Sequence, residues 1–124
     1  MRMVLLLGLV ATTARADPAL LLYGGKDNKI FLGCLNCGKF DPNSVHNEFS
    51  EYGSTFSSTS IRNKFSDYGS AFSDYSACNV YASHPPVIVD KDGKYYGKLT
   101  INRFADQTRY RAAVDWISAV CASS

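Results

Sequence analysis

The feature that most constrains this 124-residue chain is an internal repeat of sixteen residues. The segment 47–62 reads NEFSEYGSTFSSTSIR and the segment 63–78 reads NKFSDYGSAFSDYSAC, with nine identical positions. Matching residues continue beyond both copies, so the repeat block extends from about Phe40 to Tyr81, or two and a half units. Repeats of this kind bury their apolar face by stacking, and this number is near the minimum for stability. We therefore expect the block to pack against flanking elements as well.

The composition of the repeat favours turns over a helix. Each full copy has aromatic residues at its third, sixth and tenth positions, such as Phe49, Tyr52 and Phe56. That spacing suits one face of a helix. However, Ser, Asn, Gly and aromatic residues are middling or poor helix formers, and Asn and Ser bond to nearby backbone in turns. We interpret each copy as a short, irregular loop whose aromatic rings point inward and form part of the core.

A second interpretation makes the block a binding surface. Exposed Tyr and Phe with Asn and Ser suit a carbohydrate or peptide, because flat rings stack on apolar faces and amides bind hydroxyl groups. It requires aromatic rings that are partly exposed on one face. Low-complexity disorder is a third interpretation, but the regular spacing of large rings favours order. The candidate ligand-binding residues are Asn47, Tyr52, Phe56, Asn63, Tyr68 and Phe72.

The first sixteen residues have the three parts of a secretory signal peptide. A basic start at Arg2 precedes the apolar run 4–10, and Ala14-Arg15-Ala16 places small residues where a signal peptidase cleaves. The apolar run is too short to span a bilayer. We expect a signal peptide at 1–16, a single exported domain at 17–124, and a secreted or periplasmic protein without membrane insertion after cleavage.

The net charge of the chain changes when this leader is removed. The full chain has 13 Lys+Arg and 11 Asp+Glu, which gives a formal charge of +2. Arg2 and Arg15 both lie in the leader, so residues 17–124 carry 11 basic and 11 acidic residues and no net charge. A protein that binds nucleic acid through bulk electrostatics needs a basic excess or a basic stripe. We therefore expect no nucleic-acid partner.

The cysteines agree with export, because an even number in a small exported chain usually forms disulfides. Two of them form a C-x-x-C motif, for which a structural disulfide is the favoured interpretation. A redox-active pair normally opens a helix, whereas this motif follows a strand-like run. A zinc site would need the other cysteines or the histidines, whose spacing matches no standard finger. Four cysteines allow three pairings, which the sequence leaves open: Cys34, Cys37, Cys78 and Cys121.

The flanks of the repeat block predict a small α+β fold. Strand-like runs on both sides enclose Gly-containing turns, which is typical of β-hairpins. We expect the two hairpins to join in one antiparallel sheet, covered by an amphipathic helix that Asp106 caps and that runs to about Cys121. Asp90-x-Asp92-Gly93 is expected to be a turn, because no glutamate completes a calcium loop. The expected strands are 20–23, 29–35, 87–89 and 94–101.

The chain also resembles a family of small, uncharacterised bacterial exported or surface domains. The resemblance lies in FLGCLNCGKF, in the units SxxNxFSxYGSxFSS, and in PPVIVDKDGKYYGKLTINRF, and covers roughly residues 20–104. The family has the pattern G-x-L-x-x-N-K-Y followed by N-x-Y-G-x-Y-G-S-x-Y-S-S units. This chain has Phe where that pattern commonly has Tyr. The resemblance implies a bacterial exported protein and carries over no catalytic residue.

The inventory of catalytic residues is thin. The chain has two histidines, His46 and His84, and lacks the G-x-S-x-G motif of hydrolases. Nothing in the sequence assigns either histidine a nucleophile, and the acidic residues of the repeats resemble a solvated face. We expect no enzyme activity, no cofactor and no metal site. The leading hypothesis is a binding or structural module whose partner is a polysaccharide or a cell-envelope protein. The alternatives are a thiol–disulfide protein that uses the C-x-x-C pair and a passive accessory domain.

The leader generates a direct prediction. If residues 1–16 are a signal peptide, the exported protein begins at Asp17. Intact-mass measurement and N-terminal sequencing of the exported product check this. An exported product that retains Met1 would contradict the cleavage site, and Ala16→Leu should block processing in a matched culture.

Overall fold

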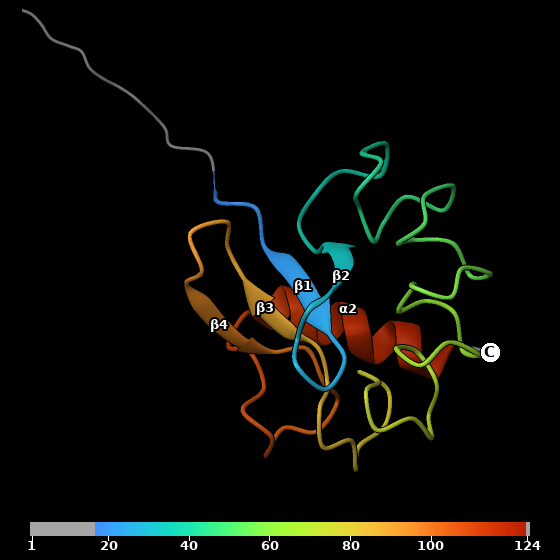
Figure 1. Ribbon diagram of the computed structural model, residues 1–124, viewed down its shortest axis with the longest axis vertical. Helices are drawn as coiled ribbons and strands as arrows, with labels where there is room; N and C mark the ends of the chain where they lie inside the picture. The colour runs from blue at the N-terminus through green and yellow to red at the C-terminus, as the bar shows by residue number, and fades with distance from the viewer. Residues whose placement is uncertain (1–16, 124) are drawn as a thin grey trace, which may run out of the picture.

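The computed structural model of the protein describes residues 17–123, so the predicted signal peptide lies outside the described residues. Within them the chain is a small α+β protein, as predicted, with a four-stranded sheet and one C-terminal helix (Figure 1). No helix in this part of the chain is long and apolar enough to cross a bilayer. The elements are β1 (Leu21–Gly24), β2 (Ile30–Cys34), β3 (Val87–Val89), β4 (Tyr95–Lys98) and α2 (Arg111–Ala122).

The sheet joins the two hairpins, which confirms the expected arrangement. Its strand order is β2-β1-β3-β4, and every neighbouring pair is antiparallel. The first strand of each hairpin pairs with the other, so that Leu22 lies opposite Ile88. The second hairpin turns at Asp90, whose carboxylate accepts the backbone N–H groups of Asp92 and Lys94 at 2.9 and 3.0 Å. The Asp90 carboxylate therefore closes a turn, as predicted.

The helix begins later than the sequence suggested. Asp106 was expected to cap it, but α2 starts at Arg111 with Tyr110 at the N-cap position and without a side-chain cap. Asp106 instead has a positive φ of 54°, and its carboxylate accepts the hydroxyl hydrogen of Tyr95 at 2.7 Å. This hydrogen bond holds the Asp106 side chain against strand β4, away from the N-terminus of α2. The prediction of a capping Asp106 is therefore wrong.

The core contains side chains from the sheet, the helix and the repeat block. Leu22, Leu32 and Ile88 from the strands and Ile117 from α2 are completely buried. Burial of large aliphatic side chains is the main source of stability in a domain this small. The buried residues that the repeat block adds to the same cluster are aliphatic, namely Val45, Ile61 and Ala77.

Two disulfides link the chain. Cys34 pairs with Cys37 at the end of β2, and Cys78 pairs with Cys121, which joins the end of the second repeat to the last turn of α2. All four cysteines are therefore paired in the described residues, and none is available as a thiolate ligand for zinc. The Cys34–Cys37 pair lies at the end of a strand and before a turn, not at the start of a helix. The thiol-activating environment of a redox motif is absent at that position.

The two disulfides should differ in their effect on stability. A cross-link stabilises the native state mainly by restricting the unfolded chain, and the effect grows with the length of the closed loop. The partners lie 43 residues apart for Cys78–Cys121 and 3 for Cys34–Cys37. Replacing both cysteines by serine should therefore lower the free energy of unfolding by roughly 4 kcal/mol for the long loop and about 2 kcal/mol for the short one.

Denaturant unfolding of the two double-serine variants measures these free energies. Equal losses, or a larger loss for the short loop, would contradict the role of Cys78–Cys121 as the link between repeat block and helix.

Candidate functional site

The repeat block is built from turns that side chains close. The amide of Asn47 accepts the N–H of Phe49 at 3.0 Å and donates to the carbonyl of Asp41 at 3.1 Å. Sixteen residues later, Asn63 accepts the N–H of Phe65 at 3.0 Å and donates to the carbonyl of Ser57 at 2.9 Å. Each asparagine therefore fixes the backbone of the aromatic residue two positions after it and ties it to the preceding turn.

Buried serines close the next turn of each unit. The Ser66 hydroxyl accepts the N–H groups of Tyr68 and Gly69 at 3.2 and 3.1 Å and lies 2.7 Å from the carbonyl oxygen of Ser60, to which it donates. Ser50 makes the equivalent bonds one unit earlier. Because buried N–H groups need partners, these hydroxyls replace the hydrogen bonds that a strand or helix would supply.

The interior of the repeat block holds small and aliphatic side chains. A buried serine and the aliphatic residue after it recur at 44–45, 60–61 and 76–77, and all six are at most 1% exposed. At Gly53 the chain passes so close to the backbone of Asn47 that a Cβ would overlap its carbonyl oxygen. Such tight coils leave no interior space for a phenyl ring. The expectation that the aromatic rings point inward is therefore wrong for the phenylalanines.

The phenylalanines of the repeat block lie instead in water. We call Phe40, Phe56 and Phe72 the first aromatic row, and Phe49, Phe65 and Tyr81 the second, since members of each row are sixteen residues apart. Together with Phe104, which follows Asn102 in the same kind of turn, they form a set of seven rings. Their exposed fractions run from 85 to 98%: Phe40, Phe49, Phe56, Phe65, Phe72, Tyr81 and Phe104.

The tyrosines of the repeats are half-buried and support the block. Tyr52 packs edge-on against Phe31 of β2, with ring centroids 4.9 Å apart. Tyr68 packs against the core. Its ring lies beside Gly24 of β1, only 3.2 Å from where a Cβ of residue 24 would be. Partial burial raises the pKa of both phenols, and neighbouring carboxylates add to the rise, from Glu51 and Asp67 respectively. These rings therefore fix the repeats to the sheet.

The structure divides the candidate ligand-binding residues into three kinds. Phe56 and Phe72 are exposed members of the first row, whereas Tyr52 and Tyr68 belong to the support. Asn47 and Asn63 use their amide oxygen and nitrogen within the turns. The candidates omitted most of the exposed rings. An Asn two residues before an aromatic residue is the sequence signal that identifies the missed Phe49, Phe65, Tyr81 and Phe104.

The ion pairs found in residues 17–123 are isolated contacts on the surface. His84 Nδ1 lies 3.3 Å from the Asp74 carboxylate on the surface, and the pKa of Asp74 is lowered, first by the backbone N–H of Ser83 and more weakly by His84. Within residues 17–123, no group of three or more His, Cys, Asp or Glu side chains is placed to hold a metal ion. Cys34 is almost completely buried, which shields one sulfur of the C-x-x-C pair from attack.

Comparisons with known proteins give no relative for this chain: no protein-family model, curated protein or solved structure matches it. The resemblance to bacterial exported domains stays a prediction. The exposed rings and the surfaces around them are the features of this chain that point to a function.

The buried serines should contribute strongly to stability. Ser66→Ala removes a hydroxyl that accepts two N–H groups, one of them the buried N–H of Gly69. The Gly69 N–H would keep only a long bond of 3.3 Å to the backbone carbonyl of Ser66. Each lost hydrogen bond costs about 0.5–1.5 kcal/mol, and we expect a total loss of about 1–3 kcal/mol in the free energy of unfolding.

The exposed Ser58 provides the matched control, and Ser58→Ala should change the free energy of unfolding by less than about 0.5 kcal/mol. Chemical denaturation of both variants measures the difference. Equal effects of the two substitutions would contradict the structural role of the Ser66 hydroxyl.

Proposed function

We propose that this chain is an exported, non-catalytic binding module that holds a protein partner through its two aromatic rows. The observation that supports it is the exposure of the six rings of these rows, which recur every sixteen residues. Small soluble domains rarely leave so many phenylalanines in water, and large exposed apolar surface commonly marks an interaction site.

The amount of ring surface matches a protein interface. An aromatic side chain buries about 150–250 Å², so seven rings offer on the order of 1,000 Å². A standard protein interface takes about 800 Å² from each partner. Aromatic residues are also the usual anchors that fill pockets on a partner. The rows therefore have both the area and the residue type of a protein-binding surface.

The turn hydrogen bonds prepare these rings for binding. The backbone N–H of Phe49, Phe56, Phe65 and Phe72 is held by the side chain two residues earlier. Anchors with a fixed backbone lose less conformational entropy on binding, which raises affinity without adding contacts. A partner therefore needs to order only the ring torsions.

A protein partner suits the rows better than a polysaccharide. Sugar recognition combines stacking rings with amides or hydroxyls that bind the sugar's own hydroxyl groups. The asparagine amides of the repeats are engaged with backbone groups, as Asn63 shows with bonds to Phe65 and Ser57. The rows thus present apolar rings without free amides beside them. A polysaccharide partner remains an outcome of the test.

Export is the compartment that best suits two disulfides. Disulfides persist in oxidising compartments and are rare in the reducing cytosol. The predicted signal peptide and the pairs Cys34–Cys37 and Cys78–Cys121 support a secreted or periplasmic location. The C-x-x-C pair carries the alternative of a thiol–disulfide protein, which the burial of Cys34 makes less favourable.

Photo-cross-linking tests the proposal. A benzophenone analogue of phenylalanine placed at Phe56 or Phe72 should cross-link to a protein of the cell envelope or secretome, which mass spectrometry identifies. The same analogue at Ile30, an exposed apolar residue outside the rows, should not. Phe56→Ser with Phe72→Ser should then weaken binding of the purified partner at least about tenfold, because buried anchors carry most of the binding energy.

Three results would contradict this function. The first is equal cross-linking at Ile30, and the second is an affinity unchanged by the double serine substitution. The third is binding to a glycan array that the same substitution abolishes, which would replace the protein partner by a polysaccharide.

A further inference from the structure

A pocket of about 390 Å³ opens beside the repeat block, between the N-terminal segment, the end of β2 and helix α2. Its volume lies in the range of sites that hold a small ligand or a side chain. The aliphatic part of its lining comes from Leu20, Leu35 and Ala113, and the ring-bearing part from His46, Tyr110 and Trp116.

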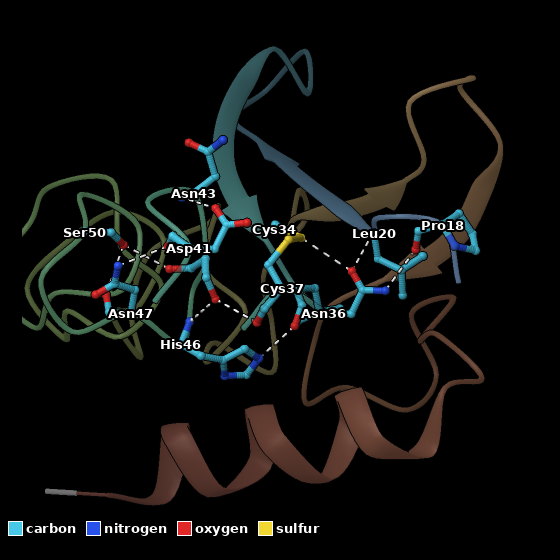
Figure 2. Close-up of a disulfide and its surroundings, with 12 residues drawn as sticks. Pro18, Leu20, Cys34, Asn36, Cys37, Asp41, Asn43, His46, Asn47 and Ser50 are labelled. Carbon is cyan, nitrogen blue, oxygen red and sulfur yellow. Dashed lines mark hydrogen bonds between the residues drawn. A yellow bond between two sulfur atoms is a disulfide. The ribbon is translucent and has the colours of Figure 1, made fainter. Parts of the chain in front are cut away.

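Hydrogen bonds hold the wall formed by the N-terminal segment. The Asn36 amide accepts the N–H of Leu20 at 2.8 Å and donates to the carbonyl of Pro18 at 2.9 Å (Figure 2). Asn36 lies within the loop that the Cys34–Cys37 disulfide closes. The short disulfide thus fixes the residue that fastens the first part of the exported chain to the pocket.

His46 links the repeat block to the helix. Its Nε2 lies 2.8 Å from the carbonyl oxygen of Leu35, and because a carbonyl only accepts, Nε2 carries the hydrogen. The ring lies between the Asn36–Cys37 turn and α2 (Figure 2) and meets Trp116 edge-to-face, with centroids 4.9 Å apart. Two rings of the pocket are thereby held in place before any ligand enters.

Such a pocket is complementary to a single aromatic ring. Aliphatic side chains exclude water from the ring faces, and neighbouring rings favour edge-to-face contacts at centroid distances of about 4.5–7 Å. Rings of this kind are abundant on the same chain, since phenylalanines of both aromatic rows project almost completely into water. The chain therefore carries both a largely apolar recess that can admit a ring and rings that are free to enter one.

We propose that a phenylalanine of the aromatic rows of one copy inserts into the Trp116 pocket of a second copy, so that the protein self-associates. This inference rests on the proposed function, since it takes the rows as the binding surface and names a second copy as their partner. The exported domain carries no net charge. Approach of two copies is therefore not opposed by a net electrostatic repulsion.

The two contacting surfaces are different, which limits the possible assemblies. A ring on one copy and a pocket on the next form a heterologous contact, which gives a reciprocal pair, a closed ring or an open chain. Blocking either surface must therefore stop self-association, and mixing two differently blocked variants must restore one contact.

Trp116 makes the pocket directly observable because it is the only tryptophan of the chain. We would purify the protein from an oxidising compartment and follow Trp116 fluorescence and sedimentation over increasing protein concentration. Ala112→Phe places a ring at the pocket from an exposed position of α2, and Ala119→Phe places the same ring on the same helix outside it. Phe56→Ser with Phe72→Ser removes the first row, and Phe49→Ser with Phe65→Ser weakens the second.

The expected result is a change in Trp116 emission that rises with protein concentration together with the sedimentation coefficient. Ala112→Phe and one of the two row variants should each raise the apparent dissociation constant at least about tenfold. Ala119→Phe should leave it within about twofold. An equimolar mixture of the Ala112→Phe variant and that row variant should form a 1:1 complex.

A monomer at every concentration, or self-association that Ala112→Phe does not change, would overturn the pocket assignment. Neither result affects the proposed function, which is tested separately by cross-linking from Phe56 and Phe72 and by the three contrary results given above. Circular dichroism confirms that each variant is folded, and Ala112→Leu provides a smaller block at the same exposed position if Ala112→Phe does not fold.

Discussion

Side-chain-to-backbone hydrogen bonds within the repeat block are the interaction on which the rest of the structure depends. Between β2 and β3 the described chain contains no regular strand or helix, yet it includes buried backbone groups that need partners. Ser50, Ser66 and Asn63 provide those partners, because their short polar side chains reach the backbone of the preceding turn. Coils closed in this way are too narrow for phenyl rings, so the interior holds serine and aliphatic residues.

The position of the phenylalanines follows from that constraint. A phenyl ring excluded from a narrow coil must project outward, and the asparagine or serine before it fixes the point from which it projects. The coils pack against a platform formed by the sheet and helix α2. The Cys78–Cys121 disulfide attaches the end of the second repeat to that helix. His46 connects the start of the repeat block to the same platform, because it bonds the Leu35 carbonyl and packs against Trp116 of α2.

A related arrangement recurs at the ends of the two hairpins. Gly33-x-Leu35 and Gly97-x-Leu99 match, and both glycines have positive φ while both leucines are buried. A lysine and an arginine then lie over the exposed rings that follow them, Lys39 over Phe40 at 5.3 Å and Arg103 over Phe104 at 5.0 Å. The two hairpins therefore each lead into a turn that presents an aromatic ring.

By itself the sequence determined what local interactions control. Gly-containing turns between apolar runs gave both hairpins, the apolar stripe around Ile117 gave the helix, and Ser and Asn gave turns instead of a helix across the repeats. Only the tertiary structure decided the disulfide pairing, the role of Asp106 and the outward direction of Phe56 and Phe72. These depend on which segments meet and how much room lies between them, and a pattern of apolar residues does not encode the width of the space that it must fill.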